Sequence, residues 1–160
     1  MSFGYKDNFH FRPIVKEDEK NVRNIIFGVL KDYGLKVDIK GVDHDLFNIV
    51  SYYKPGLFGV VEDTETDEIV GSFALYPLND KEIELRKMYL LKEYRNKGIG
   101  SWCIKFCEAY AQNAGFQYIV LESASVLKGA IQLYTKKGYA VEIHCNVVER
   151  CDVFMRKKLH

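Results

Sequence analysis

The sequence lacks the features that mark secreted, membrane-spanning or nucleic-acid-binding proteins. Its four cysteines form neither a CxxC pair nor a Cys/His comb, so neither a disulfide framework nor a zinc module is predicted. Apolar runs extend over only a few residues, and no basic segment followed by an apolar stretch stands near the N-terminus. Neither sign of charge is in excess, because 23 Lys and Arg residues face 22 Asp and Glu residues. We therefore expect a cytoplasmic protein that binds neither nucleic acid nor a membrane.

The chain also has no repeat, no low-complexity segment and no Pro/Gly/Ser-rich linker. Hydrophobic residues make up 48% of its 160 residues, close to the average for globular domains. A chain of this length can bury a sizeable core without metals or disulfides. We predict that residues 1–160 form a single domain.

Apolar periodicity predicts an α+β fold. After a first strand at 9–15, helical spacing appears over 22–33 and again over 99–114, and each stripe ends close to a glycine. Strand-like runs at 57–63, 68–78 and 82–91 are joined by polar turns, which is typical of hairpins. A buried strand (116–122), a helix ending at Gly138 and two further strands (139–143 and 152–159) complete the order. One βαβ crossover among hairpins excludes a doubly wound parallel sheet.

The run 82–91 contains a change of phase. Its apolar residues fall on odd positions at Ile83 and Leu85 but on even positions at Met88 and Leu90. Because successive side chains of a strand alternate between faces, a slip of one residue predicts a β-bulge near Arg86 and Lys87.

Residues 84–101 (ELRKMYLLKEYRNKGIGS) carry the clearest chemical signal. A strand passes through a polar turn into a helix whose start contains Gly98 and Gly100. The first amides of a helix have no intrahelical partner and lie at the positive end of its dipole, and Arg95 and Lys97 add positive charge. These features favour a site for a diphosphate, although a helix start with loop glycines and solvated basic residues has the same pattern.

Two other phosphate motifs fit less well. The P-loop string GxxxxGK[ST] does not occur in the sequence. The dinucleotide fingerprint GxGxxG is half met, because Cys103 stands where its third glycine belongs, and six mostly polar residues separate the strand from Gly98. A nucleotide-binding or NAD-binding protein therefore stays open as an alternative.

The segment resembles motif A of the GNAT superfamily of acyl-CoA-dependent N-acetyltransferases, whose signature Q/R-x-x-G-x-G/A reads RNKGIG at 95–100. A second block, AIQLYTKKGYAV at 130–141, is similar to that superfamily's A-x-x-L-Y-x-K-x-G-F. The resemblance implies a mixed, mostly antiparallel seven-stranded sheet flanked by about four helices, with a splayed pair of parallel central strands. It also implies acetyl-CoA as cosubstrate, no metal, and an amine acceptor that is a small molecule or a peptide. Family members are often dimers, so a homodimer stays open.

The resemblance assigns cofactor contacts residue by residue. Pantetheine would pair with the splayed strand at Met88, Tyr89 and Leu90, with the Leu90 amide facing the thioester carbonyl. Main-chain amides would wrap the diphosphate at Arg95, Asn96, Lys97, Gly98, Ile99, Gly100 and Ser101. Leu127 and Lys92 depart from the pattern, because many members have an asparagine and a proline at these positions.

The implied reaction is direct transfer of the acetyl group to a primary amine through a tetrahedral intermediate. An amine with a pKa near 10.4 is neutral in about one molecule in a few thousand at pH 7, so the site must remove a proton. Glu84 is the first candidate for the base, and it could equally be a solvated carboxylate on the strand face. Glu122 is the second candidate, although the sequence favours a structural hydrogen-bonding role for it. Tyr134 matches the tyrosine that protonates the departing thiolate, although a core aromatic is the alternative.

Two further points concern what the chain does. A non-catalytic acyl-CoA-binding module remains the alternative function, because Leu127 and the uncertain base leave catalysis open. His144 next to Cys145 is the nearest approach to a metal half-site, and no metal is predicted from it.

Overall fold

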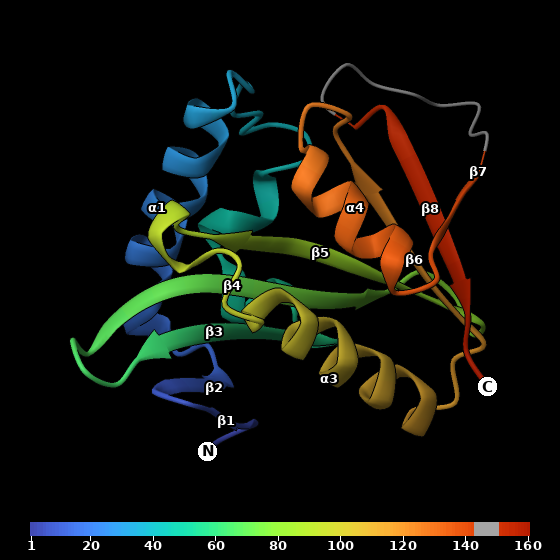
Figure 1. Ribbon diagram of the computed structural model, residues 1–160, viewed down its shortest axis with the longest axis horizontal. Coiled ribbons are helices and arrows are strands. Elements are labelled where there is room, and N and C mark those ends of the chain that lie inside the picture. Colours follow the sequence, from blue (N-terminus) through green and yellow to red (C-terminus); the bar gives the residue numbers. More distant parts are fainter. Residues whose placement is uncertain (143–150) are drawn as a thin grey trace.

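The computed structural model describes residues 1–142 and 151–160, and these residues form one eight-stranded mixed sheet with helices on both faces (Figure 1). The strands follow the order β1-β2-β3-β4-β5-β6-β8-β7 across the sheet. Their bounds are β1 Gly4–Lys6, β2 Phe9–Pro13, β3 Leu57–Asp63, β4 Glu68–Pro77, β5 Glu82–Leu90, β6 Tyr118–Ser123, β7 Ala140–Glu142 and β8 Val153–Lys158. The helices are α1 Glu19–Asp32, α2 Ile49–Tyr52, α3 Ile99–Asn113 and α4 Lys128–Lys136.

The predicted α+β architecture is confirmed, but the sheet has eight strands rather than seven. The additional strand, β1, pairs antiparallel with β2 through Gly4↔Phe11, Tyr5↔His10 and Lys6↔Phe9. The sequence gives little sign of β1, because it has three residues and its large apolar side chain, Tyr5, is 64% exposed. A half-buried strand shows alternation only over four residues or more.

The parallel pair lies at the centre of the sheet and separates along its length. β5 and β6 pair in parallel from Glu82↔Tyr118 to Leu85↔Leu121, whereas the other neighbouring pairs of described strands are antiparallel. Beyond this point β5 runs on to Leu90 and β6 to Ser123 without pairing with each other. The two strands therefore splay, as expected.

The bulge expected in β5 is present. Ala74 of β4 pairs with Arg86 and Ser72 pairs with Tyr89, so two β5 residues, Lys87 and Met88, face one residue of β4. Lys87 has a left-handed φ of 52°, and its carbonyl accepts a hydrogen bond from Ser72 Oγ at 2.7 Å. The bulge turns the end of β5 away from β6 and opens the middle of the sheet.

Helices cover both faces of the sheet, and each face has its own core. α3 and α4 lie in front of the sheet in Figure 1, and their apolar side chains pack with Ile83 and Leu85 of β5. α1 and α2 lie behind it and pack on Val60 and Ala74. Among the described helices, none is both long and apolar enough to cross a membrane.

Candidate functional site

A cavity of about 350 Å³ lies where β5 and β6 separate. Its walls come from β5 between Glu84 and Tyr89, from the end of β6, from α4, and from the segment 35–52 that connects α1 to α2. Met88 and Tyr89, two of the strand residues expected to contact the cofactor, line it. The Leu90 side chain packs among the core residues under α3, and the role of its main-chain amide stays a prediction.

The turn before α3 presents main-chain amides that have no protein partner. The first hydrogen bond of the helix runs from the Trp102 amide to the Gly98 carbonyl at 3.1 Å. Within the described part of the chain, no acceptor pairs with the six amides from Asn96 to Ser101. Asn96 and Gly98 have positive φ values of 62° and 83°, which bend the main chain around these amides. Six unpaired donors at a helix N-terminus form a site for an anion.

The two glycines of the motif permit close approach by protein side chains. A Cβ on residue 98 would lie 2.8 Å from Cε of Lys6, which comes from β1. A Cβ on residue 100 would lie 2.9 Å from Cδ2 of Leu133 on α4 and 4.0 Å from Cε of Met88. Gly100 therefore allows α4 to pack against α3, and Met88 links the turn to the cavity.

The Arg95 side chain hydrogen-bonds to other residues of the protein. Its guanidinium donates to the Leu90 carbonyl at 3.1 and 3.0 Å and to the Tyr33 hydroxyl at 2.8 Å. Its amide donates to the Lys92 carbonyl at 3.3 Å. Arg95 thus fixes the turn to the end of β5 and to α1, and its side-chain charge is committed there.

Tyr134 is a core aromatic residue that also reaches the cavity. Its ring is buried in the core beneath α4, where it contacts Tyr139 with ring centroids 5.9 Å apart. It also lines the cavity, and its hydroxyl makes no hydrogen bond to any described residue. Burial raises the pKa of the Tyr134 phenol well above its ordinary value, with a smaller contribution from Tyr89. The hydroxyl is therefore protonated at neutral pH and available to an acceptor in the cavity.

The two candidate bases share the cavity wall. Ile83 and Leu85 point into the core under α3, so the alternation of the strand turns Glu84 to the opposite face, and the same reasoning applies to Glu122 on β6. The Glu84 carboxylate accepts a hydrogen bond from Arg86 Nε, and both glutamates line the cavity.

A buried charged cluster beside the cavity was not predicted from the sequence. Lys87 Nζ lies 3.0 Å from Asp43 Oδ1 and 3.4 Å from Asp45 Oδ1, and it donates to the Val42 carbonyl at 2.6 Å. The Tyr53 hydroxyl donates to Asp45 Oδ2, while Asp45 Oδ1 accepts no hydrogen bond from any described residue. Burial, together with the Asp45 carboxylate, raises the pKa of the Tyr53 phenol. The cluster holds segment 42–45 against the bulge. In the sequence, the one local sign of this cluster was Lys87, a charged residue within the bulge of a central strand.

The remaining sequence candidates do not form a site. Cys103 and Cys107 are buried in the core under α3, and Cys151 lines the cavity. His144 and Cys145 lie outside the described residues. Within residues 1–142 and 151–160, no three His, Cys, Asp or Glu side chains are grouped to hold a metal ion.

Comparisons with known proteins agree on one family. A family model described as the acetyltransferase (GNAT) family matches residues 27–139. Uncharacterized N-acetyltransferase YjgM of Escherichia coli K12 is 31% identical and covers 92% of this chain and 93% of its own length. Probable N-acetyltransferase 14 of Xenopus tropicalis is 39% identical over 61% of this chain. The chain spans about half of that relative, since the match covers 48% of it.

Solved structures share the fold. An acetyltransferase of the GNAT family from Staphylococcus aureus Mu50 superposes with a TM-score of 0.87 at 20% identity, over 95% of this chain and 99% of that one. YncA of Salmonella typhimurium, whose structure holds its cofactor acetyl-CoA, superposes with a TM-score of 0.73 at 16% identity, over 96% and 95%. With the family model covering most of the sequence and the Escherichia coli relative matching nearly all of it, the chain belongs to the acetyltransferase (GNAT) family.

Proposed function

We propose that this protein is an N-acetyltransferase that moves the acetyl group of acetyl-CoA directly onto a primary amine. One observation carries the proposal. Six unpartnered amides, Asn96 to Ser101, open beside a cavity whose wall contains the unpartnered hydroxyl of Tyr134. A donor-lined turn for a diphosphate and a proton donor near the acyl group are the two parts that this transfer needs.

The residues present fit acetyl-CoA. The amides from Asn96 to Ser101 would hold its diphosphate, and Met88 and Tyr89 would lie along its pantetheine arm. The cosubstrate supplies a thioester, which is an activated acyl group. The acceptor, a small-molecule or peptide amine, would enter the cavity from the side of segment 35–52.

The balance of the reaction assigns two tasks to this chain. A carbon–nitrogen bond forms and the carbon–sulfur bond breaks. Two protons leave the nitrogen of the ammonium acceptor, one before attack and one from the tetrahedral intermediate, while the thiolate takes up one proton, so one proton is released to solvent. We assign removal of protons from nitrogen to Glu84 or Glu122, acting directly or through water, and protonation of the thiolate to Tyr134. A thiol has a pKa near 8.5, so transfer from the buried Tyr134 phenol runs uphill and suits an acid that acts late, as the thiolate develops.

Thiol release from acetyl-CoA with a panel of primary amines tests the activity. In a Tyr134→Phe variant we expect kcat to fall by about 10²-fold, within the usual range for general acid catalysis, while Kd for acetyl-CoA stays unchanged. Tyr110→Phe, on an exposed part of α3, is the matched control and should behave as wild type. Unchanged kcat in Tyr134→Phe would remove the acid role, and no release with any amine would contradict the activity.

The two candidate bases are separated by their pH profiles. The variant that removes the base, Glu84→Gln or Glu122→Gln, should lose the acidic limb of the profile of kcat/KM against pH. If both variants keep that limb, neither carboxylate is the base.

A further inference from the structure

Strand β1, absent from the fold expected for this sequence, places a lysine on the turn before α3. Lys6 is the last residue of β1, and its side chain lies across Gly98. A Cβ built on residue 98 would be 2.8 Å from Lys6 Cε and 3.5 Å from Lys6 Nζ. An ammonium group therefore lies within a few ångströms of the main chain at the N-terminus of the helix.

Several contacts fix β1 against α3, so the position of Lys6 is built into the fold. The Phe3 amide donates to the Phe11 carbonyl at 2.8 Å, and the Phe3 ring packs on Phe106 of α3 with centroids 4.7 Å apart. A Cβ on Gly4 would lie 3.0 Å from Trp102, in the first turn of the same helix. These contacts pack β1 against α3, and the Lys6 side chain lies at the N-terminus of that helix.

The Lys6 ammonium is available to a ligand. Its side chain is 35% exposed, and the partner it has among the described residues is the adjacent Asp7 carboxylate, 3.0 Å away and 70% exposed. An exposed pair of neighbouring residues contributes little free energy, so a phosphate oxygen can replace the carboxylate. Of the two cations expected at this turn, Arg95 is committed to Leu90 and Tyr33, whereas Lys97 is exposed.

We propose that Lys6 Nζ binds the diphosphate of acetyl-CoA, opposite the amides of Asn96 to Ser101. The inference rests on the proposed function and adds a residue outside the motif to the cosubstrate site. The amides supply donors from the helix, and Lys6 supplies a full positive charge from the edge of the sheet. Gly98 makes this possible, because any side chain there would displace the lysine stem.

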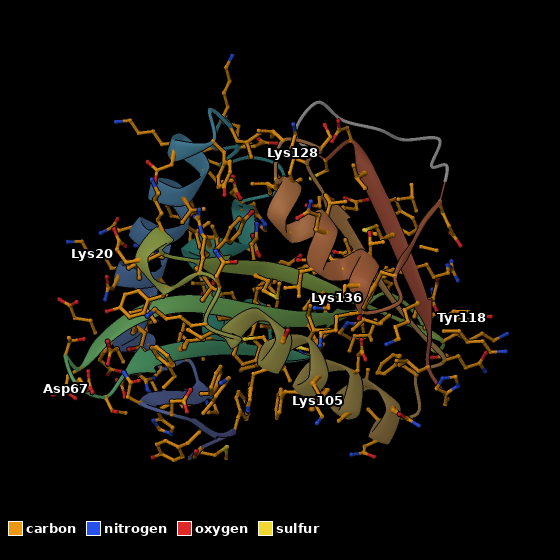
Figure 2. The ribbon with its side chains drawn as sticks, in the orientation of Figure 1. Lys20, Asp67, Lys105, Tyr118, Lys128 and Lys136 are labelled. Atoms are coloured by element: carbon orange, nitrogen blue, oxygen red, sulfur yellow. The ribbon has the colours of Figure 1, made fainter. Side chains whose placement is uncertain are left out.

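Calorimetric titration of the whole chain with acetyl-CoA tests the proposal. Lys6→Met keeps a stem against Gly98 and removes the charge, and we expect its Kd to rise about five- to tenfold, as for the loss of one charged hydrogen bond. Lys6→Arg should bind within about twofold of wild type, because it keeps a phosphate-binding cation. Lys105→Met is the matched control, since this exposed lysine lies about two turns further along α3 (Figure 2). Its Kd should equal that of wild type.

Shortened ligands show which phosphate is bound. With acetyl-dephospho-CoA, which lacks the 3′-phosphate, Lys6→Met should show the same fold-change as with acetyl-CoA. With S-acetylpantetheine, which lacks every phosphate, Lys6→Met and wild type should have equal kcat/KM. Melting temperatures of all variants should agree within about 2 °C, since an exposed ion pair contributes little to stability.

The outcomes separate this inference from the proposed function. If wild type binds acetyl-CoA and Lys6→Met binds it equally well, the role of Lys6 is wrong and the function stands. A fold-change that disappears with acetyl-dephospho-CoA would overturn the diphosphate assignment. If wild type does not bind acetyl-CoA, the proposed function itself fails.

Discussion

Gly98 has a left-handed main-chain conformation and a lysine side chain close beside it. Its φ of 83° is left-handed, a conformation that costs residues with a Cβ about 1–2 kcal/mol. The space beside it is occupied by the stem of Lys6. Backbone geometry therefore favours glycine here independently of any ligand, whereas the flexible end of Lys6 could shift to make room for a Cβ.

We expect Gly98→Ala to lower the free energy of unfolding by about 1–2 kcal/mol and to weaken acetyl-CoA binding, because the turn must shift. Denaturant unfolding and calorimetric titration measure the two effects. Gly28→Ala is the control, since Gly28 lies in α1 with nothing within 4 Å of its Cβ position. That variant should gain about 0.5–1 kcal/mol. Equal effects of the two substitutions would show that Gly98 is not strained.

Strand β5 depends on a buried lysine at its bulge. The Lys87 side chain is 7% exposed and faces Asp43 and Asp45, whose side chains are 0% and 5% exposed. Removing one partner from a buried ion pair typically costs about 3–5 kcal/mol, because the remaining charge is left in a poorly solvated place. The cluster therefore couples the shape of β5 to the cavity wall.

Lys87→Met should lower the free energy of unfolding by about 3–5 kcal/mol at pH 7, measured by urea denaturation. Lys31→Met, at an exposed position of α1, should stay within about 0.5 kcal/mol of wild type. A loss below about 1 kcal/mol in Lys87→Met would mean that water or other groups already solvate the two carboxylates.

The short turn Lys92–Tyr94, which leads into the anion site, is anchored by Asp63 at the end of β3. Asp63 accepts hydrogen bonds from the Glu65 amide at 3.0 Å, from Asn8 Nδ2 at 2.9 Å and from the Tyr94 hydroxyl at 2.9 Å. The Glu65 amide, opposed in part by burial, lowers the pKa of Asp63, and Asn8 and Tyr94 lower it further.

A carboxyl group whose pKa is lower in the folded state stabilises the fold above its unfolded pKa, which is about 3.9 for aspartate. This stabilisation disappears as the pH falls through the lower, folded value. We therefore expect Asp63→Asn to be less stable than wild type at pH 7 and to lose less stability below about pH 4. Urea unfolding between pH 7 and pH 3 measures both. The exposed Asp80→Asn should follow the wild-type curve, and an Asp63→Asn curve parallel to wild type would contradict the assignment.

The longer elements could be predicted from the sequence because their burial patterns are local. β3, β4 and β5 each span at least seven residues, and the phase change between Leu85 and Met88 located the bulge correctly. β1 was missed because three residues with an exposed tyrosine show no alternation.

The amides of the candidate site could be predicted because they depend only on the local turn and the two glycines. The side chains around them depend on distant partners. Arg95 contacts Tyr33 across 62 residues, and Lys87 contacts Asp43 across 44. Sequence periodicity does not predict contacts between distant segments. The hydrogen bonds of Arg95 to Leu90 and Tyr33, and the buried cluster around Lys87, were therefore not predicted.

In the molecule as a whole, one sheet brings the parts of the proposed site together. Its central strands separate between two helical layers (Figure 1). The cavity there is lined by Tyr134 of α4 and by residues of segment 35–52. The turn before α3 lies next to this cavity, because Met88 lines the cavity and also approaches Gly100. The turn with the unpaired amides and the cavity are thus neighbours, joined by Met88, as the proposed function requires.

A crystal structure of the protein with CoA bound tests this arrangement most directly. We expect the diphosphate to accept hydrogen bonds from the amides of Asn96 to Ser101, with the sulfur facing the hydroxyl of Tyr134. A diphosphate held elsewhere, or these amides bonded to protein groups while CoA occupies another surface, would contradict the proposed site.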